Sequence, residues 1–266
     1  MEVFGVIGYP LGHSMSPVMH NAAFRETGYQ GIYVPFEVRP ENFESAIEGI
    51  KALGIRGINI TIPYKERILE FFRQRREVRE IGAANTVDLK RKTCHNTDVD
   101  GVIGALQSSG VDAKDMEVLV VGAGGAAKAC VYALKDDNEV YITNRTAKKG
   151  VELAERFDVE FIERERLETL KFDLIINATP LGMKGFPEKL PVSEKILGKK
   201  PAVFDMVYNP PETLLIRKAL SYGCKAVSGV DMLVYQGAKA FEIFTGKKAP
   251  VEVMKKAVVS ELKKIA

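Results

Sequence analysis

The segment Glu117–Arg145, EVLVVGAGGAAKACVYALKDDNEVYITNR, contains an apolar strand, a glycine-rich turn, a helical run and a second apolar strand. This order is typical of a βαβ unit that binds a dinucleotide. Gly122 permits a tight turn, Gly124 lets backbone N–H groups approach a pyrophosphate, and Ala127 lets helix and strand pack closely. The helix N-terminus adds partial positive charge that favours an anion. The segment therefore predicts a Rossmann-type domain.

The end of the second strand indicates which dinucleotide binds. NAD sites usually carry Asp or Glu roughly 20 residues beyond the glycines, where the carboxylate accepts from the ribose 2′-OH. This chain instead continues with Asn144, Arg145, Thr146, Ala147, Lys148 and Lys149. A guanidinium offers a 2′-phosphate a planar fork of donors, so NADP is the expected cofactor. Alternatively, Arg145 is a solvated residue beside a helix capped by Thr146, which leaves the missing acid unexplained.

Outside this segment, length and charge limit the possibilities. A chain of 266 residues with 46% hydrophobic residues suits two domains. A net charge of +3 is nearly balanced, so nothing demands a nucleic acid partner. The basic run RQRREVRE, residues 73–80, is expected to form a solvated face, with contact to cofactor phosphate as the alternative.

Cysteine usage and hydropathy indicate the compartment. The three cysteines are unclustered and lack metal-ligand spacing, which predicts reduced thiols in a cytoplasmic protein. The opening MEVFGVIGYP lacks the basic region and cleavage site of a signal peptide, and no apolar run reaches the roughly 18 residues of a membrane span. His13, His20 and His95 also lack ligand spacing, so no metal is expected.

The remaining chain predicts a second α/β domain. Strands near residues 3–7, 33–38 and 56–61 alternate with helices at 16–28 and 41–53, which favours a mostly parallel sheet. Ser16 and Pro17 are typical of an N-cap and a first helical residue. Two final helices, near 232–245 and 251–265, are expected to return to this domain. We therefore expect a substrate-binding catalytic domain at 1–100 plus 237–266, and an NADP-binding Rossmann domain at 101–236.

Polar residues of the first domain gather at strand ends and helix starts: Ser14, Ser16, Asn59, Thr61, Lys65, Asn85 and Asp98. Each alone is typical of a cap or a turn. Because the carboxyl ends of parallel strands converge on one edge, these side chains can face one small polyhydroxylated ligand.

The chain resembles the shikimate dehydrogenase family. The matching segments follow the family's order from Met1 to about Gly246, so the resemblance spans nearly the whole chain. They are GHSMSPVMHNAAF, INITIPYK, GAANTV, HNTDVDG, GAGGAAKA, NRT, NATPLGM, DMVYNPPET and SGVDMLVYQGAKAFEIFTG.

The resemblance implies NADPH-linked reduction of 3-dehydroshikimate to shikimate in aromatic amino acid (chorismate) biosynthesis. It implies Lys65 and Asp98 as the catalytic pair, and Ser14 and Ser16 as ligands of the substrate carboxylate. Asn59, Thr61, Asn85, Gln236 and Tyr208 would line the rest of the substrate pocket, with Asp98 also holding a ring hydroxyl. The cofactor would contact Gly122, Ala123, Gly124, Gly125, Ala126, residues 144–149, Met206 and Gly229. The assembly is a possible homodimer.

The residue types agree with hydride transfer to a ketone. The developing oxyanion can be stabilised and protonated by a positioned ammonium, and in reverse neutral Lys65 would take the hydroxyl proton. An adjacent carboxylate favours the protonated amine, so Asp98 is expected to orient Lys65 and bind a hydroxyl.

Two positions depart from the family pattern, and two other functions stay open. Asp231 stands where glycine is common, with an N-cap role as the plain explanation, and Pro180 replaces a usual serine, for which Thr179 could substitute. One alternative is a quinate/shikimate dehydrogenase that uses NAD, although Ser16 and Arg145 argue against it. The other is a catalytically inactive nucleotide-binding regulator.

Overall fold

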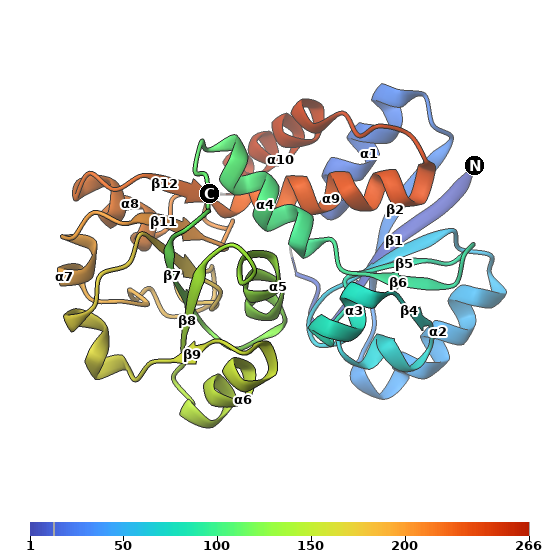
Figure 1. Ribbon diagram of the computed structural model, residues 1–266. Helices are drawn as coiled ribbons and strands as arrows, with labels where there is room; N and C mark the ends of the chain where they lie inside the picture. Colours follow the sequence, from blue (N-terminus) through green and yellow to red (C-terminus); the bar gives the residue numbers. More distant parts are fainter. Residues whose placement is uncertain (13, 266) are drawn as a thin grey trace. The chain divides into compact units, whose positions relative to one another are not determined.

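The computed structural model describes residues 1–12 and 14–265, and His13 lies outside the described residues. The chain divides into two compact units (Figure 1). The first comprises Met1–Asp98 and Val234–Ile265, and the second comprises Val99–Leu233. The chain enters the second unit at the start of helix α4 (Asp98–Ser108) and returns to the first within α9 (Gly229–Thr245).

A six-stranded mixed sheet forms the centre of the first unit, in the order β2-β1-β3-β5-β6-β4. The strands β1 and β2 are parallel, as are β1 and β3, whereas β5 runs antiparallel to β3 and β6. Their bounds are β1 Glu2–Gly8, β2 Gly31–Glu37, β3 Gly57–Ile60, β4 Arg73–Gln74, β5 Thr86–Asp88 and β6 Thr93–His95.

Helices cover both faces of this sheet. On one face, Phe4 of β1 contacts Phe24 of α1 (Ser16–Thr27) and Phe244 of α9. Figure 1 shows α10 (Val251–Ile265) beside α1, and the two helices pack together. On the other face, Ile47 of α2 (Phe43–Ala52) joins a buried cluster with residues of β1 and β3. The short elements η1 (Pro40–Asn42), η2 (Arg67–Glu70) and α3 (Arg76–Ile81) complete the unit.

The second unit is built on six parallel strands in the order β12-β11-β10-β7-β8-β9. Numbered within the unit, this is the order 6-5-4-1-2-3 of a dinucleotide-binding fold, and the sheet reverses direction of progression between β7 and β10. The bounds are β7 Glu117–Val121, β8 Glu139–Thr143, β9 Glu160–Phe161, β10 Leu174–Asn177, β11 Ala202–Asp205 and β12 Ala226–Ser228.

Apolar residues alternate along β7 toward the two faces. Val118 and Val120 pack with α4, α5 (Gly125–Leu134) and α6 (Ala147–Phe157). Leu119 and Val121 pack with η3 (Arg164–Thr169), α7 (Glu194–Leu197) and α8 (Leu214–Ser221). A sheet covered on both faces explains why its central strands are continuous apolar runs. The expected two-part α/β fold, with C-terminal helices in the first unit, is confirmed.

The expected N-cap of α1 is corrected. Met15, not Ser16, occupies that position, and Ser16 is the first helical residue. The basic run at 73–80 contains strand β4 and most of helix α3, and its four arginines are exposed, as expected for a solvated face.

Candidate active site

Lys65 and Asp98 form an ion pair in the first unit. Lys65 lies beyond the end of β3, and its carbonyl oxygen accepts from the Ala84 N–H at 2.7 Å. Asp98 begins α4 directly after β6, and its N–H donates to Asn96 Oδ1 at 3.1 Å. Lys65 Nζ lies 2.5 Å from Asp98 Oδ2, and the two side chains are 19% and 6% exposed. The carboxylate is therefore held inside the protein while the ammonium keeps a route to a ligand.

Asn85 holds the other oxygen of that carboxylate. Its Nδ2 donates to Asp98 Oδ1 at 2.9 Å and lies 3.4 Å from Gln236 Oε1. Its Oδ1 accepts from the Thr97 backbone N–H at 2.8 Å. Residues far apart in the sequence thus meet: Asn85 precedes β5, Asp98 follows β6, and Gln236 belongs to α9.

Asn59 lies in β3, beside this group, and is buried. Its Nδ2 donates to Thr86 Oγ1 at 2.9 Å, and its Oδ1 accepts from the Tyr33 hydroxyl at 2.7 Å. Burial holds the pKa of Tyr33 well above its ordinary value, although a hydrogen bond with the Ser16 side chain opposes that rise. Tyr33 is therefore a neutral donor in the pH range where proteins work.

Ser14 and Thr61 are the other residues of this unit that were expected to bind substrate. Ser14 Oγ accepts from the Ser16 N–H at 3.4 Å, at the start of α1. Thr61 comes directly after β3, half-buried, and its N–H donates to the carbonyl of Ile7 at 2.9 Å. Hydrogen bonds therefore connect Ser16, Asn59, Asn85, Asp98, Lys65 and Gln236 into one set, and Ser14 joins it through Ser16.

Tyr33, Thr86 and Thr97 also belong to this set but were not among the residues expected from the sequence. Tyr33 and Thr86 lie in strands, where an aromatic or β-branched residue ordinarily fills the core. Their hydroxyls carry the connection, and no spacing pattern in the sequence distinguishes a buried hydroxyl that bonds a side chain from one that does not.

The glycine turn of the second unit follows β7 as expected. Gly122 has a φ of +122°, and a Cβ there would lie 3.0 Å from the carbonyl oxygen of Ala178. Only glycine fits both the conformation and the space. Gly124 is the N-cap of α5 and is exposed, and an added Cβ at Gly124 would meet nothing within 4 Å. Ala123, Gly125 and Ala126 are half-buried around it.

A basic group follows β8. Arg145, Thr146, Ala147, Lys148 and Lys149 are exposed, and the half-buried Asn144 donates from Nδ2 to the Thr146 carbonyl at 2.9 Å. Thr146 occupies the N-cap of α6, but its side chain makes no capping hydrogen bond. The cap interpretation of Thr146 therefore lacks the bond that would explain it. A helix start with an open glycine turn and a nearby basic group fits a phosphate-rich dinucleotide.

Met206, Tyr208 and Gly229 lie at the same edge of the second sheet, after β11 and β12. Met206 and Tyr208 are half-buried. A Cβ on Gly229 would lie 2.4 Å from the Val207 carbonyl oxygen and 2.6 Å from that of Met206. The loop after β11 and the start of α9 therefore touch through backbone at Gly229.

A buried carboxylate braces the loops at this edge. Asp205 accepts from Asn177 Nδ2 at 2.9 Å, from the Thr213 hydroxyl at 2.5 Å and from the Val207 N–H at 3.1 Å. Burial raises the pKa of Asp205, and these three donors oppose the rise. The Thr179 hydroxyl donates to Asn177 Oδ1 at 2.6 Å, so Thr179 is connected to Asp205 through Asn177.

Asp231 lies in the first turn of α9, two residues after the helix begins at Gly229, and is buried. The helix therefore starts before this residue, so the expected N-cap role is wrong.

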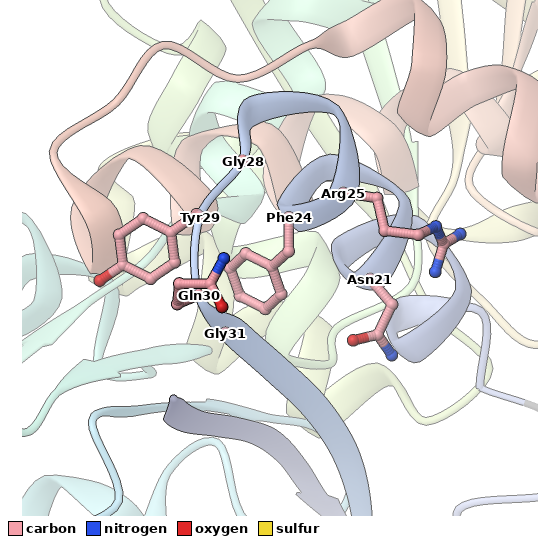
Figure 2. A pocket seen from close by; sticks show the side chains of 7 residues that line it. All are labelled: Asn21, Phe24, Arg25, Gly28, Tyr29, Gln30 and Gly31. Carbon is pink, nitrogen blue, oxygen red and sulfur yellow. The ribbon is translucent and has the colours of Figure 1, made fainter.

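Two surface hollows are lined by neither Lys65 nor Asp98. Figure 2 shows one of about 240 Å³ where α1 turns into β2, lined by Asn21, Phe24, Arg25 and residues 28–31. The other, of about 550 Å³, is lined by arginines of the basic run and by Arg91. Arg75 pairs with Glu77, Arg76 with Glu80, and Arg91 with Asp88. Neither hollow contains a residue that the family resemblance assigns to substrate or cofactor.

Among residues 1–12 and 14–265, no three His, Cys, Asp or Glu side chains are grouped to hold a metal ion. Within the same ranges, no helix combines the length and apolar character needed to cross a membrane.

The parallel sheet order and the glycine turn at its reversal point define a Rossmann-type dinucleotide-binding domain. Family models match three parts of the chain. They are the shikimate dehydrogenase substrate binding domain at residues 6–87, the shikimate / quinate 5-dehydrogenase domain at 105–182, and the shikimate 5'-dehydrogenase C-terminal domain at 229–259. The chain belongs to the shikimate dehydrogenase family.

Similar proteins agree over nearly the full length. The chain is 49% identical to "Shikimate dehydrogenase (NADP(+))" of Archaeoglobus fulgidus, across 99% of this chain and 100% of the relative. A crystal structure of a shikimate dehydrogenase in complex with NADP+ superposes with a TM-score of 0.92 at 39% identity, covering 98% of this chain and 96% of that one. The shikimate 5-dehydrogenase of Thermus thermophilus, in complex with NADP(H) and shikimate, gives 0.91 at 33% identity, covering 98% and 99%.

Proposed function

We propose that this protein catalyses the reversible NADPH-dependent reduction of 3-dehydroshikimate to shikimate in the biosynthesis of chorismate and aromatic amino acids. The observation that carries this proposal is the Lys65–Asp98 pair, at 2.5 Å, inside a set of amides and hydroxyls suited to a polyhydroxylated ligand. The family membership of the whole chain supports the same reaction.

In this proposal, Lys65 and Asp98 form the catalytic pair. NADPH supplies the hydride that reduces the ketone carbon. As the carbonyl π bond breaks, the Lys65 ammonium stabilises the charge that develops on oxygen and gives that oxygen a proton from Nζ. In the reverse direction neutral Nζ takes the hydroxyl proton. Asp98 keeps the amine in position and binds a ring hydroxyl.

The substrate residues divide by chemistry. Ser14 and Ser16 bind the carboxylate, because their hydroxyls discriminate by geometry without adding charge. Asn59, Thr61, Asn85, Asp98 and Gln236 hold ring hydroxyls, and Tyr208 lines the pocket. In this assignment, the domain at 1–100 plus 237–266 binds substrate, and the domain at 101–236 binds NADP.

The cofactor residues comprise the glycine turn, the basic group after β8, and two positions after β11 and β12. The turn, Gly122 to Ala126, holds the pyrophosphate at the start of α5, while Met206 and Gly229 contact the nicotinamide end. Arg145 holds the 2′-phosphate, with Asn144, Thr146, Ala147, Lys148 and Lys149 around it. Support comes from the exposed guanidinium of Arg145 and from the absence of a carboxylate at this point in the sequence.

Purified protein tests the proposal when shikimate or quinate is crossed with NADP or NAD and the reduced cofactor is followed. We expect the specificity constant for shikimate with NADP to exceed that of every other pair. A preference for quinate with NAD would favour the first alternative, and no turnover with any pair would favour the inactive regulator.

A Lys65→Ala variant tests the catalytic role. We expect kcat to fall by a factor of about 10² to 10⁴, the usual contribution of a general acid–base group, while shikimate still binds. Isothermal titration with shikimate measures the binding separately. An unchanged kcat would remove Lys65 from the mechanism.

Two further properties belong to the proposal. A cytoplasmic location is supported by the three cysteines, which are buried and unclustered in the sequence. A homodimer stays a prediction, which light scattering of the purified protein checks.

A further inference from the structure

A directed chain of hydrogen bonds runs through the first unit from Tyr33 to Asp98. The Tyr33 hydroxyl donates to Asn59 Oδ1 at 2.7 Å, and Asn59 Nδ2 donates to Thr86 Oγ1 at 2.9 Å. The Thr86 hydroxyl donates to Asn85 Oδ1 at 3.0 Å, and Asn85 Nδ2 donates to Asp98 Oδ1 at 2.9 Å. Tyr33, Asn59, Asn85, Thr86 and Asp98 are all buried.

Two neighbouring groups, one that can only accept and one that can only donate a hydrogen bond, determine the orientation of the Asn85 side-chain amide. A carboxylate oxygen only accepts and a backbone N–H only donates, so Nδ2 must face Asp98 while Oδ1 must face Thr97. The Thr97 N–H lies 2.8 Å from that oxygen. The Thr86 hydroxyl donates to Asn85 Oδ1 at 3.0 Å and accepts from Asn59 Nδ2 at 2.9 Å. The Thr97 hydroxyl lies beside both groups, 3.2 Å from Thr86 Oγ1 and 3.1 Å from Asn85 Oδ1.

The backbone carbonyl of Asn85 determines the orientation of the Asn59 side-chain amide. Its Nδ2 also donates to the backbone carbonyl of Asn85 at 3.2 Å, and a carbonyl only accepts. Both N–H bonds of this amide are therefore engaged within the protein, and its Oδ1 must face the Tyr33 hydroxyl. Asn59 keeps only acceptor capacity for a ligand, at Oδ1. The second N–H of Asn85 has only the long contact with Gln236 Oε1, at 3.4 Å, so a ligand oxygen can take its place.

Neighbours hold Tyr33 itself in place. The Asn21 side chain brackets its backbone, since Asn21 Nδ2 donates to the Tyr33 carbonyl at 2.8 Å and the Tyr33 N–H donates to Asn21 Oδ1 at 2.9 Å. The His20 ring stacks on the Tyr33 ring with centroids 4.3 Å apart and planes 2° from parallel. Figure 2 shows Asn21 on α1, close to the segment that leads into β2.

We propose that Tyr33 and Thr86 are positioning residues of the substrate site, which set Asn59 as a hydrogen-bond acceptor and Asn85 as a donor toward ring hydroxyls. Tyr33 acts through Asn59, and Thr86 acts through both amides and, by way of Asn85, on the carboxylate that holds Lys65. The proposal rests on the function proposed above, because it gives these amides a substrate to recognise.

Steady-state kinetics of Tyr33→Phe and Thr86→Val test the proposal, since each replacement keeps the shape and removes the hydroxyl. We expect the KM for shikimate to rise about three- to tenfold in Tyr33→Phe, the range for one lost hydrogen bond, with the KM for NADP unchanged. Thr86→Val should raise the KM for shikimate and also lower kcat. Matched controls are Tyr29→Phe, before the same strand, and Thr93→Val, in the neighbouring strand β6.

A double-mutant cycle separates positioning from general stability. If Tyr33 acts through Asn59, adding Tyr33→Phe to Asn59→Ala should leave the KM for shikimate as it is in Asn59→Ala alone. Independent, multiplying effects on KM in the double variant would overturn the proposal, as would a KM for NADP that rises in parallel.

Side-chain amide NMR tests the orientation without turnover. In ¹⁵N-labelled protein we expect slow solvent exchange of the Asn59 NH₂ protons, and faster exchange in Tyr33→Phe and Thr86→Val but not in the controls. Unchanged exchange in both variants would overturn the positioning role. Absence of shikimate turnover in the parent protein would contradict the proposed function instead, and the NMR result would still decide the orientation.

Discussion

The preference for NADP proposed for this protein depends on the side chain of Arg145. Arg145 is exposed at the end of β8, and Glu or Asp is absent from the position where NAD sites use a carboxylate. A guanidinium that binds a 2′-phosphate makes charge-assisted hydrogen bonds, which contribute about 1.5–3 kcal/mol each. The preference for NADP is therefore expected to depend on one replaceable residue.

In Arg145→Ala we expect the KM for NADP to rise by a factor of about 10 to 100, with the KM for NAD nearly unchanged, because only NADP carries the 2′-phosphate. Initial rates at varied cofactor concentration measure both constants. Arg166→Ala, an exposed arginine of the same unit, is the control. Equal effects on the two cofactors would contradict a role in binding the 2′-phosphate.

His20 makes the stability of the protein depend on pH. It is completely buried, both of its ring nitrogens lack a hydrogen-bond partner among the described residues, and burial lowers its pKa from 6.5 to about 3. Between these values the unfolded chain binds a proton that the folded chain does not. Stability is therefore lost as pH falls from 6.5 toward 3.

By this linkage, the free energy of unfolding should fall by about 2–3 kcal/mol between pH 7 and pH 4.5 through His20 alone. A His20→Asn variant should lose that much less over the same interval, whatever its stability at pH 7. Urea unfolding at both pH values measures the difference. Parallel pH dependence in the two proteins would show that His20 does not take up the proton.

At the scale of elements, helix α10 stabilises the first unit by covering α1. Its buried residues Met254, Val258 and Leu262 recur at a spacing of four, which places them on one face of the helix. Met254 is completely buried, and its Cε lies 3.6 Å from where a Cβ on Gly237 of α9 would stand. The C-terminal helix is therefore part of the core rather than an appendage.

Met254→Ala should lower the free energy of unfolding by about 2–5 kcal/mol, because it removes buried methylene groups and leaves a cavity. Lys256→Ala, on the exposed side of the same helix, should change it by less than about 0.5 kcal/mol. Chemical denaturation followed by circular dichroism compares them. A loss below about 1 kcal/mol in Met254→Ala would mean that α10 is loosely packed.

Sequence reasoning found the long, periodic elements but missed the short helix α3. The βαβ unit from β7 to β8 was predictable because strand, glycine turn and helix each have their own signal. Helix α3 was missed because only Val78 and Ile81 are buried in its six residues, and four charged residues obscure that pattern. The N-cap of α1 was misplaced because Ser16 is a favourable cap but lies one residue inside the helix.

The candidate site could be predicted for Lys65 and Asp98 through the resemblance to a known family, and the structure places the two side chains 2.5 Å apart. It was not predictable for Tyr33 and Thr86. Their hydroxyls matter through hydrogen bonds between strands that are far apart in sequence, and a single sequence does not contain that pairing. The assigned roles of all these residues stay predictions until the variants are measured.

For the whole molecule, the path of the chain has a consequence for folding. The second unit is one continuous segment, Val99–Leu233, with a complete six-stranded sheet, whereas the first unit needs both ends of the chain. A complete sheet covered on both faces has the core of an independent domain.

A fragment of residues 99–233 should therefore fold cooperatively and gain thermal stability from NADP, by about 2.7 kcal/mol at 100 times the dissociation constant. A fragment of residues 1–98 should remain unfolded, because it lacks the helices that cover α1. Differential scanning calorimetry of both fragments checks the prediction. A 1–98 fragment that unfolds cooperatively would show that α9 and α10 are dispensable.

The three buried thiols give this molecule its own labelling sites. Cys94 lies in the first unit, Cys130 and Cys224 lie in the second, and all three are buried. Burial raises the pKa of Cys94 to about 12, and only a thiolate reacts quickly with an alkylating reagent. The rate at which each thiol is modified, measured by mass spectrometry, should therefore report how often the unit that contains it opens. No engineered probe is needed.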